Sequence, residues 1–101
     1  MYFIGHREYP LLLSNEEYAV KIIDELKNFL NERKIPQEYS INVKKDIMAC
    51  CGTFPIGIVV EIEGPKKSLL EYLDLMINSK IKEIIKRENI QSIDSKPIEI
   101  I

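Results

Sequence analysis

The sequence is poor in the side chains that hold metal ions and clusters. Its 101 residues include one histidine, His6, and two cysteines, the adjacent pair Cys50 and Cys51. A four-ligand zinc or iron–sulfur site needs further cysteines or histidines at short spacing. Adjacent cysteines also make a strained disulfide. We therefore expect no metal and no cofactor, and we expect the two cysteines to be free thiols near a turn.

Long apolar runs and strong positive charge are also missing. No run approaches the roughly 20 residues of a membrane span. The opening MYFIGHREYP lacks the basic start, apolar middle and cleavage site of a signal peptide. The formal net charge of −2 excludes a strongly cationic nucleic-acid binder. These absences predict a cytoplasmic protein with one domain, residues 1–101.

Two stretches have the apolar spacing of amphipathic helices. Residues 14–34 and residues 68–87 carry apolar side chains every three or four positions. Each stretch starts with a serine three residues before a glutamate, Ser14 and Ser68, which is the spacing of a capping box. Basic residues close the second stretch, where they complement the helix dipole, and Asn89 is a plausible stop. The sequence therefore predicts two helices.

Strand patterns lie around these helices. Residues 39–45 and 56–64 alternate apolar and polar side chains, and the tip between them, residues 46–55, lets them form an antiparallel hairpin. Residues 2–13 predict another strand, and residues 92–101 are either a short last strand or a loosely attached tail. The predicted fold is an α+β two-layer sandwich: two helices on one face of a small antiparallel sheet, βαββα with a possible extra C-terminal strand.

The second helix is apolar around more of its circumference than one sheet can cover. At about 100° per residue its apolar side chains span roughly 240°, against roughly 120° in the first helix. One interpretation places this helix centrally, against both the sheet and the first helix. The other leaves part of it as a seam for another protein chain. The predicted seam consists of Leu70, Leu73, Ile77, Ile81 and Ile84.

A short pattern within this helix suggests a family. Residues 77–84 read INSKIKEI after Leu73, the first helix opens with EEYA at residues 16–19, and the next strand contains YSINV at residues 39–43. These stretches resemble the CTAG/Pcc family, the small dimerising subunit of the archaeal and eukaryotic KEOPS complex. In that family the helix carries a Leu-Asn-Ser-x-Leu-Arg-x-Ile pattern. The resemblance covers roughly residues 8–86.

The resemblance implies a non-catalytic scaffold subunit of a complex that makes threonylcarbamoyladenosine in tRNA. Such a chain would pair with itself or a close relative and dock its helices against those of the threonylcarbamoyl-transferase subunit. The seam would supply apolar contact, and Asn78 and Ser79 would supply hydrogen bonds that fix the register. Basic residues could hold tRNA, indirectly or weakly, or could instead be a solvated helix end. They are Lys80, Lys82, Lys86 and Arg87.

Two other functions are weighed against this one. A small-ligand-sensing domain of ferredoxin-like shape would frame a pocket between the 46–55 tip and the closing strand. An enzyme would need a nucleophile, a base and an orienting group, and no serine or cysteine lies at a recognisable spacing from His6. Glu61 and Glu63 share a strand face and could bind a cation, although such pairs are more often the wet side of a sheet. The sequence predicts a protein that is not an enzyme.

Overall fold

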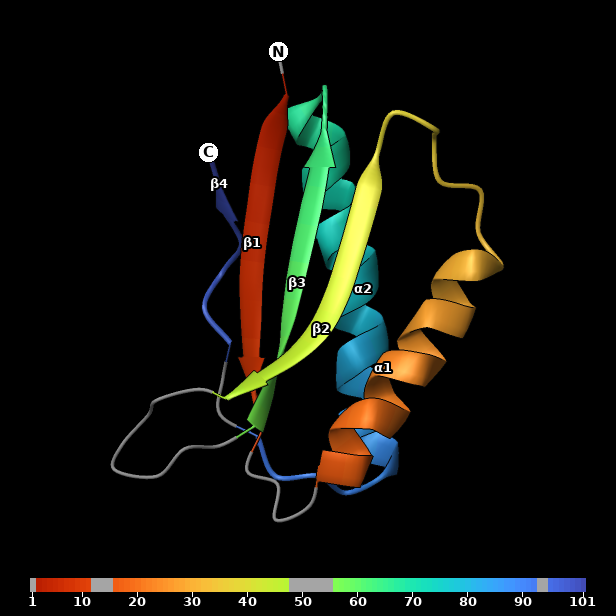
Figure 1. The fold of residues 1–101 in the computed structure, drawn as a ribbon, viewed down its shortest axis with the longest axis vertical. Helices are drawn as coiled ribbons and strands as arrows, with labels where there is room; N and C mark the ends of the chain where they lie inside the picture. Colours follow the sequence, from red (N-terminus) through yellow and green to blue (C-terminus); the bar gives the residue numbers. More distant parts are fainter. Residues whose placement is uncertain (1, 12–15, 48–55, 93–94) are drawn as a thin grey trace.

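A computed structural model describes residues 2–11, 16–47, 56–92 and 95–101. The 46–55 tip with Cys50 and Cys51, apart from its first two residues, and the expected cap Ser14 lie outside the described residues. The elements follow one another as predicted, and the closing strand is present (Figure 1). In chain order they are β1 (Phe3–Pro10), α1 (Glu16–Asn31), β2 (Ser40–Ile47), β3 (Ile56–Gly64), α2 (Lys67–Arg87) and β4 (Glu99–Ile100).

The four strands form one antiparallel sheet in the order β2-β3-β1-β4. β1 pairs with β3 over its whole length, and Pro10 ends it, as suits a residue without a backbone N–H. β4 pairs with the other edge of β1. There the backbones of Ile4 and Ile101 exchange two hydrogen bonds of 3.1 and 2.9 Å. Among the described residues, β2 therefore forms a long edge of the sheet that pairs with no further strand.

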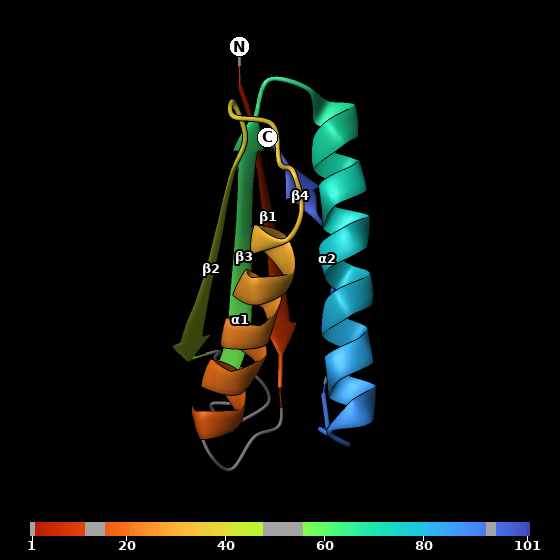
Figure 2. The same ribbon diagram turned by 90° about the vertical axis from the view of Figure 1, so that its right-hand side faces the viewer.

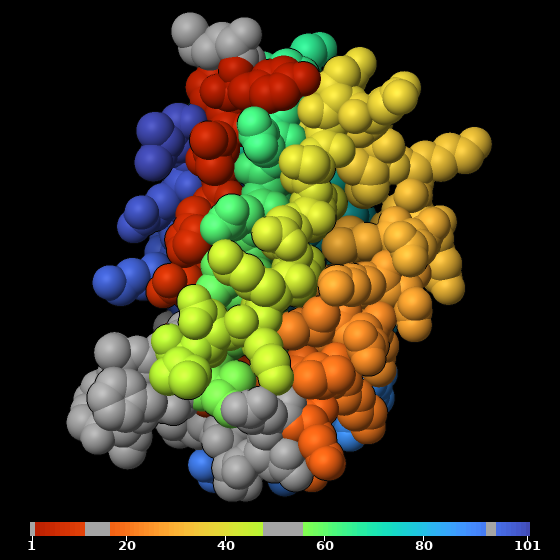
Figure 3. Space-filling model, in the orientation of Figure 1, coloured from red at the N-terminus to blue at the C-terminus, as the bar shows by residue number. Residues whose placement is uncertain are grey.

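Both helices lie on the same face of the sheet, so the molecule has two layers (Figure 2). α1 packs against β2 and β3, and α2 packs against β1 and β3. Figure 3 looks onto the other sheet face, where side chains of β1, β3 and β2 reach the surface with no helix in front of them. Neither of the helices in the described part of the chain is long and apolar enough to cross a membrane.

The core lies between the sheet and the two helices, and it contains the predicted seam. The seam residues of α2 are at most 2% exposed and pack in one cluster with Ile22 and Leu26 of α1 and with Ile58, Val60 and Ile62 of β3. The prediction that they form a partner surface is therefore wrong, because α2 lies centrally and its own chain covers them. The corrected residues are Leu70, Leu73, Ile77, Ile81 and Ile84.

The sequence predicts the C-terminal end of α2 correctly and its N-terminal cap incorrectly. α2 stops as predicted: Asn89 has a φ of 53°, and the N–H groups of Asn89 and Ile90 donate to carbonyls of the last turn. Its predicted capping box is wrong, because Ser68 lies inside the helix and the cap residue Lys66 makes no side-chain capping bond. The Lys66 N–H instead donates to the Tyr39 hydroxyl at 3.1 Å. α1 ends at Asn31, a few residues earlier than expected.

Candidate functional site

The apolar arc of α2 is divided between the core and the solvent. One side holds the buried seam. The other side holds Tyr72 and Leu75, which are 62% and 65% exposed, with Leu69 and Met76 half-buried beside them. Apolar side chains therefore remain uncovered on this helix, but they are not the ones that we expected a partner to contact.

These side chains line a groove between α1 and α2. A depression of about 650 Å³ is bounded by Phe29 of α1 and by Tyr72, Leu75, Met76 and Ser79 of α2, among others. A second depression, of about 340 Å³, shares Tyr72 and Met76 with the first and continues toward residues 33–36. The two depressions form one continuous groove, which we call the helix groove.

The spacing of the α2 residues along the helix groove suits contact with another helix. Leu69, Tyr72, Met76, Ser79 and Glu83 follow one another at alternating intervals of three and four residues. In coiled coils this spacing keeps one row of side chains facing a second helix. Ser79 is the small residue of the row, and it is exposed. It thus keeps the surface position that we predicted for it.

One end of the helix groove carries cations without carboxylate partners. Arg33 stacks on the Phe29 ring, with its guanidinium carbon 3.6 Å from the ring centroid. Lys34 follows Arg33, both residues are exposed, and both line the groove. Within the described residues neither forms an ion pair. This end of the groove is therefore positively charged.

The opposite end is neutralised by ion pairs that join the two helices. Arg87 of α2 donates to Glu25 of α1 at 2.5 Å, and Lys80 lies 4.0 Å from the same carboxylate. Lys21 of α1 lies 2.7 Å from Glu88. The hydrogen bond from Arg87 lowers the pKa of Glu25 below its usual value. These contacts hold α1 and α2 together below the helix groove.

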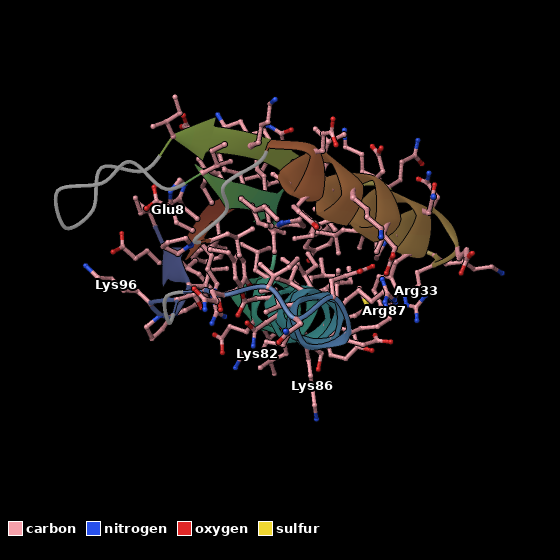
Figure 4. All side chains as sticks on the ribbon, turned by 90° about the horizontal axis from the view of Figure 1, so that it is seen from below. Glu8, Arg33, Lys82, Lys86, Arg87 and Lys96 are labelled. Atoms are coloured by element: carbon pink, nitrogen blue, oxygen red, sulfur yellow. The ribbon has the colours of Figure 1, made fainter. Side chains whose placement is uncertain are left out.

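The four basic residues predicted to contact tRNA therefore fall into two pairs. Lys80 and Arg87 are engaged by carboxylates of their own chain. Lys82 and Lys86 are exposed and point away from the sheet (Figure 4), and neither makes an ion pair within the described residues. Of the four predicted residues, Lys82 and Lys86 are therefore the two whose charges no carboxylate of the described residues pairs with.

A buried charged cluster lies between β1 and α2. Arg7 Nη1 donates to Asp74 Oδ2 at 2.9 Å, and the two side chains are 11% and 8% exposed. Arg7 Nε and Nη2 both donate to Ser95 Oγ, at 3.3 and 2.9 Å. In the part of the chain that the structure describes, the buried Tyr9 hydroxyl and the buried Oδ1 of Asn78 have no hydrogen-bond partner. Burial is the main reason why the pKa of Tyr9 is raised.

The sequence contains a signal for this cluster in the position of Asp74. Asp74 lies on the same face of the helical wheel as Leu70, Ile77 and Ile81, so a carboxylate stood in an otherwise apolar row. A buried carboxylate needs a cationic partner. The position of that partner cannot be derived from spacing, because Arg7 lies 67 residues away in the chain.

The uncovered sheet face is polar. His6 Nε2 lies 3.3 Å from Glu8, and His6 Nδ1 lies 3.7 Å from Glu61, which faces it on β3. Glu61 also lies 4.0 Å from Lys44. Among the described residues, no group of three histidine, cysteine or acidic side chains could hold a metal ion. On this face Glu61 thus contacts His6 and Lys44, and the pairing of Glu61 with Glu63 around a cation stays a prediction.

The comparisons with known proteins define the fold. The sequence matches no family model and no curated protein. Among solved structures it is similar to the de novo designed protein Foldit4, with 15% identity and a TM-score of 0.63 over 100% of this chain and 94% of that one. It is also similar to a dimeric ferredoxin-like protein of unknown function from Thermobifida fusca, with 14% identity and a TM-score of 0.57 over 99% and 90%.

Further similar structures are larger proteins. An aminopeptidase from Bacillus cereus matches with 9% identity and a TM-score of 0.53 over 99% of this chain, which spans only 28% of that protein. Identities this low show the fold alone. The chain is therefore an α+β protein of ferredoxin-like architecture, and its function has to be inferred from its own surface.

Proposed function

We propose that this chain is a non-catalytic docking subunit that holds a helix of a partner protein in its helix groove. The observation that carries the proposal is the exposure of Tyr72 and Leu75 beside the half-buried Phe29 and Met76. Contiguous apolar surface of this kind on a soluble domain normally marks an interaction site. Large aromatic side chains are also the ones that contribute most to such contacts.

The partner segment is an amphipathic helix with acidic side chains at one end. Its apolar face fits the three-and-four spacing of the α2 row. Its acidic end lies over Arg33 and Lys34, the two cations of the groove that have no carboxylate partner in the described residues. The acidic residues of the partner helix pair with Arg33 and Lys34 at one end of the groove, whereas the charges at the other end are paired within this chain. This difference fixes the direction in which the partner helix lies.

The resemblance to the CTAG/Pcc family supplies the class of partner. In this proposal the chain pairs with itself or a close relative in the cytoplasm and docks the threonylcarbamoyl-transferase subunit of a KEOPS-like complex that modifies tRNA. The docking surface differs from the one first predicted: the seam of α2 is core, and Tyr72, Leu75 and Met76 take its place. Lys82 and Lys86 are the free cations for weak contact with tRNA phosphates.

The test is copurification with the transferase subunit. We expect the wild-type chain to copurify with it, and Leu75→Glu to abolish binding because a carboxylate would enter the apolar contact without a partner. Leu75 is mostly exposed, so this variant should fold normally, as far-UV circular dichroism would show.

Glu63→Lys is the control, since it changes the charge of an exposed residue on the uncovered sheet face, away from the helix groove. It should bind as the wild type does. Light scattering should in addition show a dimer at micromolar concentration. A wild-type chain that stays monomeric and ignores the transferase subunit would contradict the proposal, and so would a folded Leu75→Glu variant that binds normally.

A further inference from the structure

A small cavity lies at the end of β1, apart from the helix groove. Its volume is about 50 Å³, and it is lined by residues of β1, α2 and the segment after α2. A single backbone bridge from Leu11 to Ser92 ties that segment to β1 beside the cavity. The lining residues that the inference uses are Tyr9, Lys82, Ser92 and Ser95.

Three hydroxyl-bearing side chains line the cavity. Tyr9 is only 4% exposed, and its hydroxyl has no hydrogen-bond partner among the described residues. A buried hydroxyl without a partner costs free energy, so its persistence calls for an unseen acceptor. Ser95 Oγ accepts both of its hydrogen bonds from Arg7, which leaves its own hydrogen free to donate elsewhere. Ser92 adds a third hydroxyl at the rim.

Two cationic side chains lie near these hydroxyls: Arg7, whose charge is paired with Asp74, and Lys82, which lines the cavity. The Nε and Nη2 edge of Arg7 is the fork that arginine normally offers to two oxygens of a carboxylate or phosphate. Here that edge meets one hydroxyl oxygen, while Asp74 is held at Nη1 instead. Lys82 also lines the cavity, and its side chain extends away from the sheet, without an ion pair in the described residues (Figure 4).

We infer that this cavity, bounded by Tyr9, Ser92 and Ser95 with Arg7 behind it and Lys82 at its mouth, binds a small oxyanion such as phosphate. Its volume of about 50 Å³ exceeds the roughly 10–15 Å³ that a single water needs, so it has room for more than one water-sized group. Such an ion would accept hydrogen bonds from these hydroxyls and attract the Lys82 ammonium. The site is independent of the helix groove and of any partner that docks there.

The experiment measures binding of inorganic phosphate to the purified chain. We expect millimolar phosphate to raise the melting temperature above that in chloride at the same ionic strength, and to broaden the phosphorus resonance in nuclear magnetic resonance. Tyr9→Phe removes only the hydroxyl and should weaken binding about tenfold or more. Without phosphate the same variant should melt at the same temperature as the wild type or higher, because an unpartnered buried hydroxyl is gone.

Two lysine variants separate the site from general charge effects. Lys82→Gln should weaken phosphate binding, whereas Lys96→Gln, which removes the same charge outside the cavity, should leave it unchanged. The inference is overturned if the wild type responds equally to phosphate and chloride, in which case the cavity holds water alone. It is also overturned if Tyr9→Phe and Lys82→Gln bind as tightly as the wild type.

Measuring the binding of a phosphomonoester beside that of inorganic phosphate distinguishes a site for the phosphoryl group of a larger molecule from a site for the free ion. Binding of glycerol phosphate as well as inorganic phosphate would support a site that takes the phosphoryl group of a larger molecule through the open mouth. Binding of inorganic phosphate alone would support a site for the free ion. Binding of neither would overturn the inference.

Discussion

The division of α2 into a buried and an exposed apolar side can be tested with two alanine substitutions. Ile77 is fully buried and Leu75, two residues earlier in the same helix, is 65% exposed. Ile77→Ala removes three buried carbon atoms, each of which contributes about 0.8 kcal/mol to the free energy of unfolding. The cavity left behind raises the total loss of stability to about 2–5 kcal/mol. Leu75→Ala should change stability by no more than about 0.5 kcal/mol, since little burial is lost and alanine favours helix.

Thermal and urea unfolding followed by circular dichroism would measure both costs. In a domain of this size each kcal/mol shifts the melting temperature by about 4–8 °C, so Ile77→Ala should melt at least about 8 °C lower than the wild type. Leu75→Ala should melt within a few degrees of it. Equal costs for the two variants, or a cost below about 1 kcal/mol for Ile77→Ala, would refute the assignment of the seam to the core.

Three further substitutions probe the fold. Gly64→Ala should destabilise by about 1–3 kcal/mol in urea unfolding, because an added Cβ would lie 2.1 Å from the Tyr39 ring; an unchanged midpoint would contradict this. Arg7→Met should cost about 3–5 kcal/mol by leaving a buried carboxylate unpaired, and a loss under about 1 kcal/mol would show that the pair is hydrated. The lowered pKa of Glu25 means that its pair with Arg87 stabilises the fold above the usual glutamate pKa and is lost as the pH falls through the lowered value. Glu25→Gln should therefore be less stable than the wild type at pH 7 and equal to it in strong acid, and a difference that persists in acid would exclude this cause.

The local periodic patterns of the sequence were sufficient to predict the fold class. The alternation at residues 56–64 and the three-and-four spacing at residues 68–87 gave a strand and a helix whose observed bounds differ by one residue at most. These periodicities work because they reflect one buried face per element. The capping box at Ser68 failed because the helix starts one residue earlier and Tyr39 supplies the hydrogen bond to the Lys66 N–H.

The candidate site was harder to predict, because a helical wheel gives the width of an apolar face but not which part of it meets the sheet. The predicted arc included both the Ile77 side and the Tyr72 side, and we assigned the wrong one to a partner. The choice depends on where α1 lies, and no local pattern carries that information. The contact between Arg7 and Asp74 could not be predicted from local patterns either. The two residues are far apart in the sequence, and only the packing of the helix against the sheet brings them together.

The charged outer face of the sheet restricts how this protein can assemble. Stacking a second sheet on that face would bury His6, Glu8 and Glu61 together with their counterparts from the other copy, and the cost of dehydrating so many ionisable groups opposes it. Copies that associate must therefore meet through their helices or extend the sheet sideways along β2. In either geometry the charged outer face of the sheet stays in contact with solvent, whether the copies meet through their helices or share one continuous sheet.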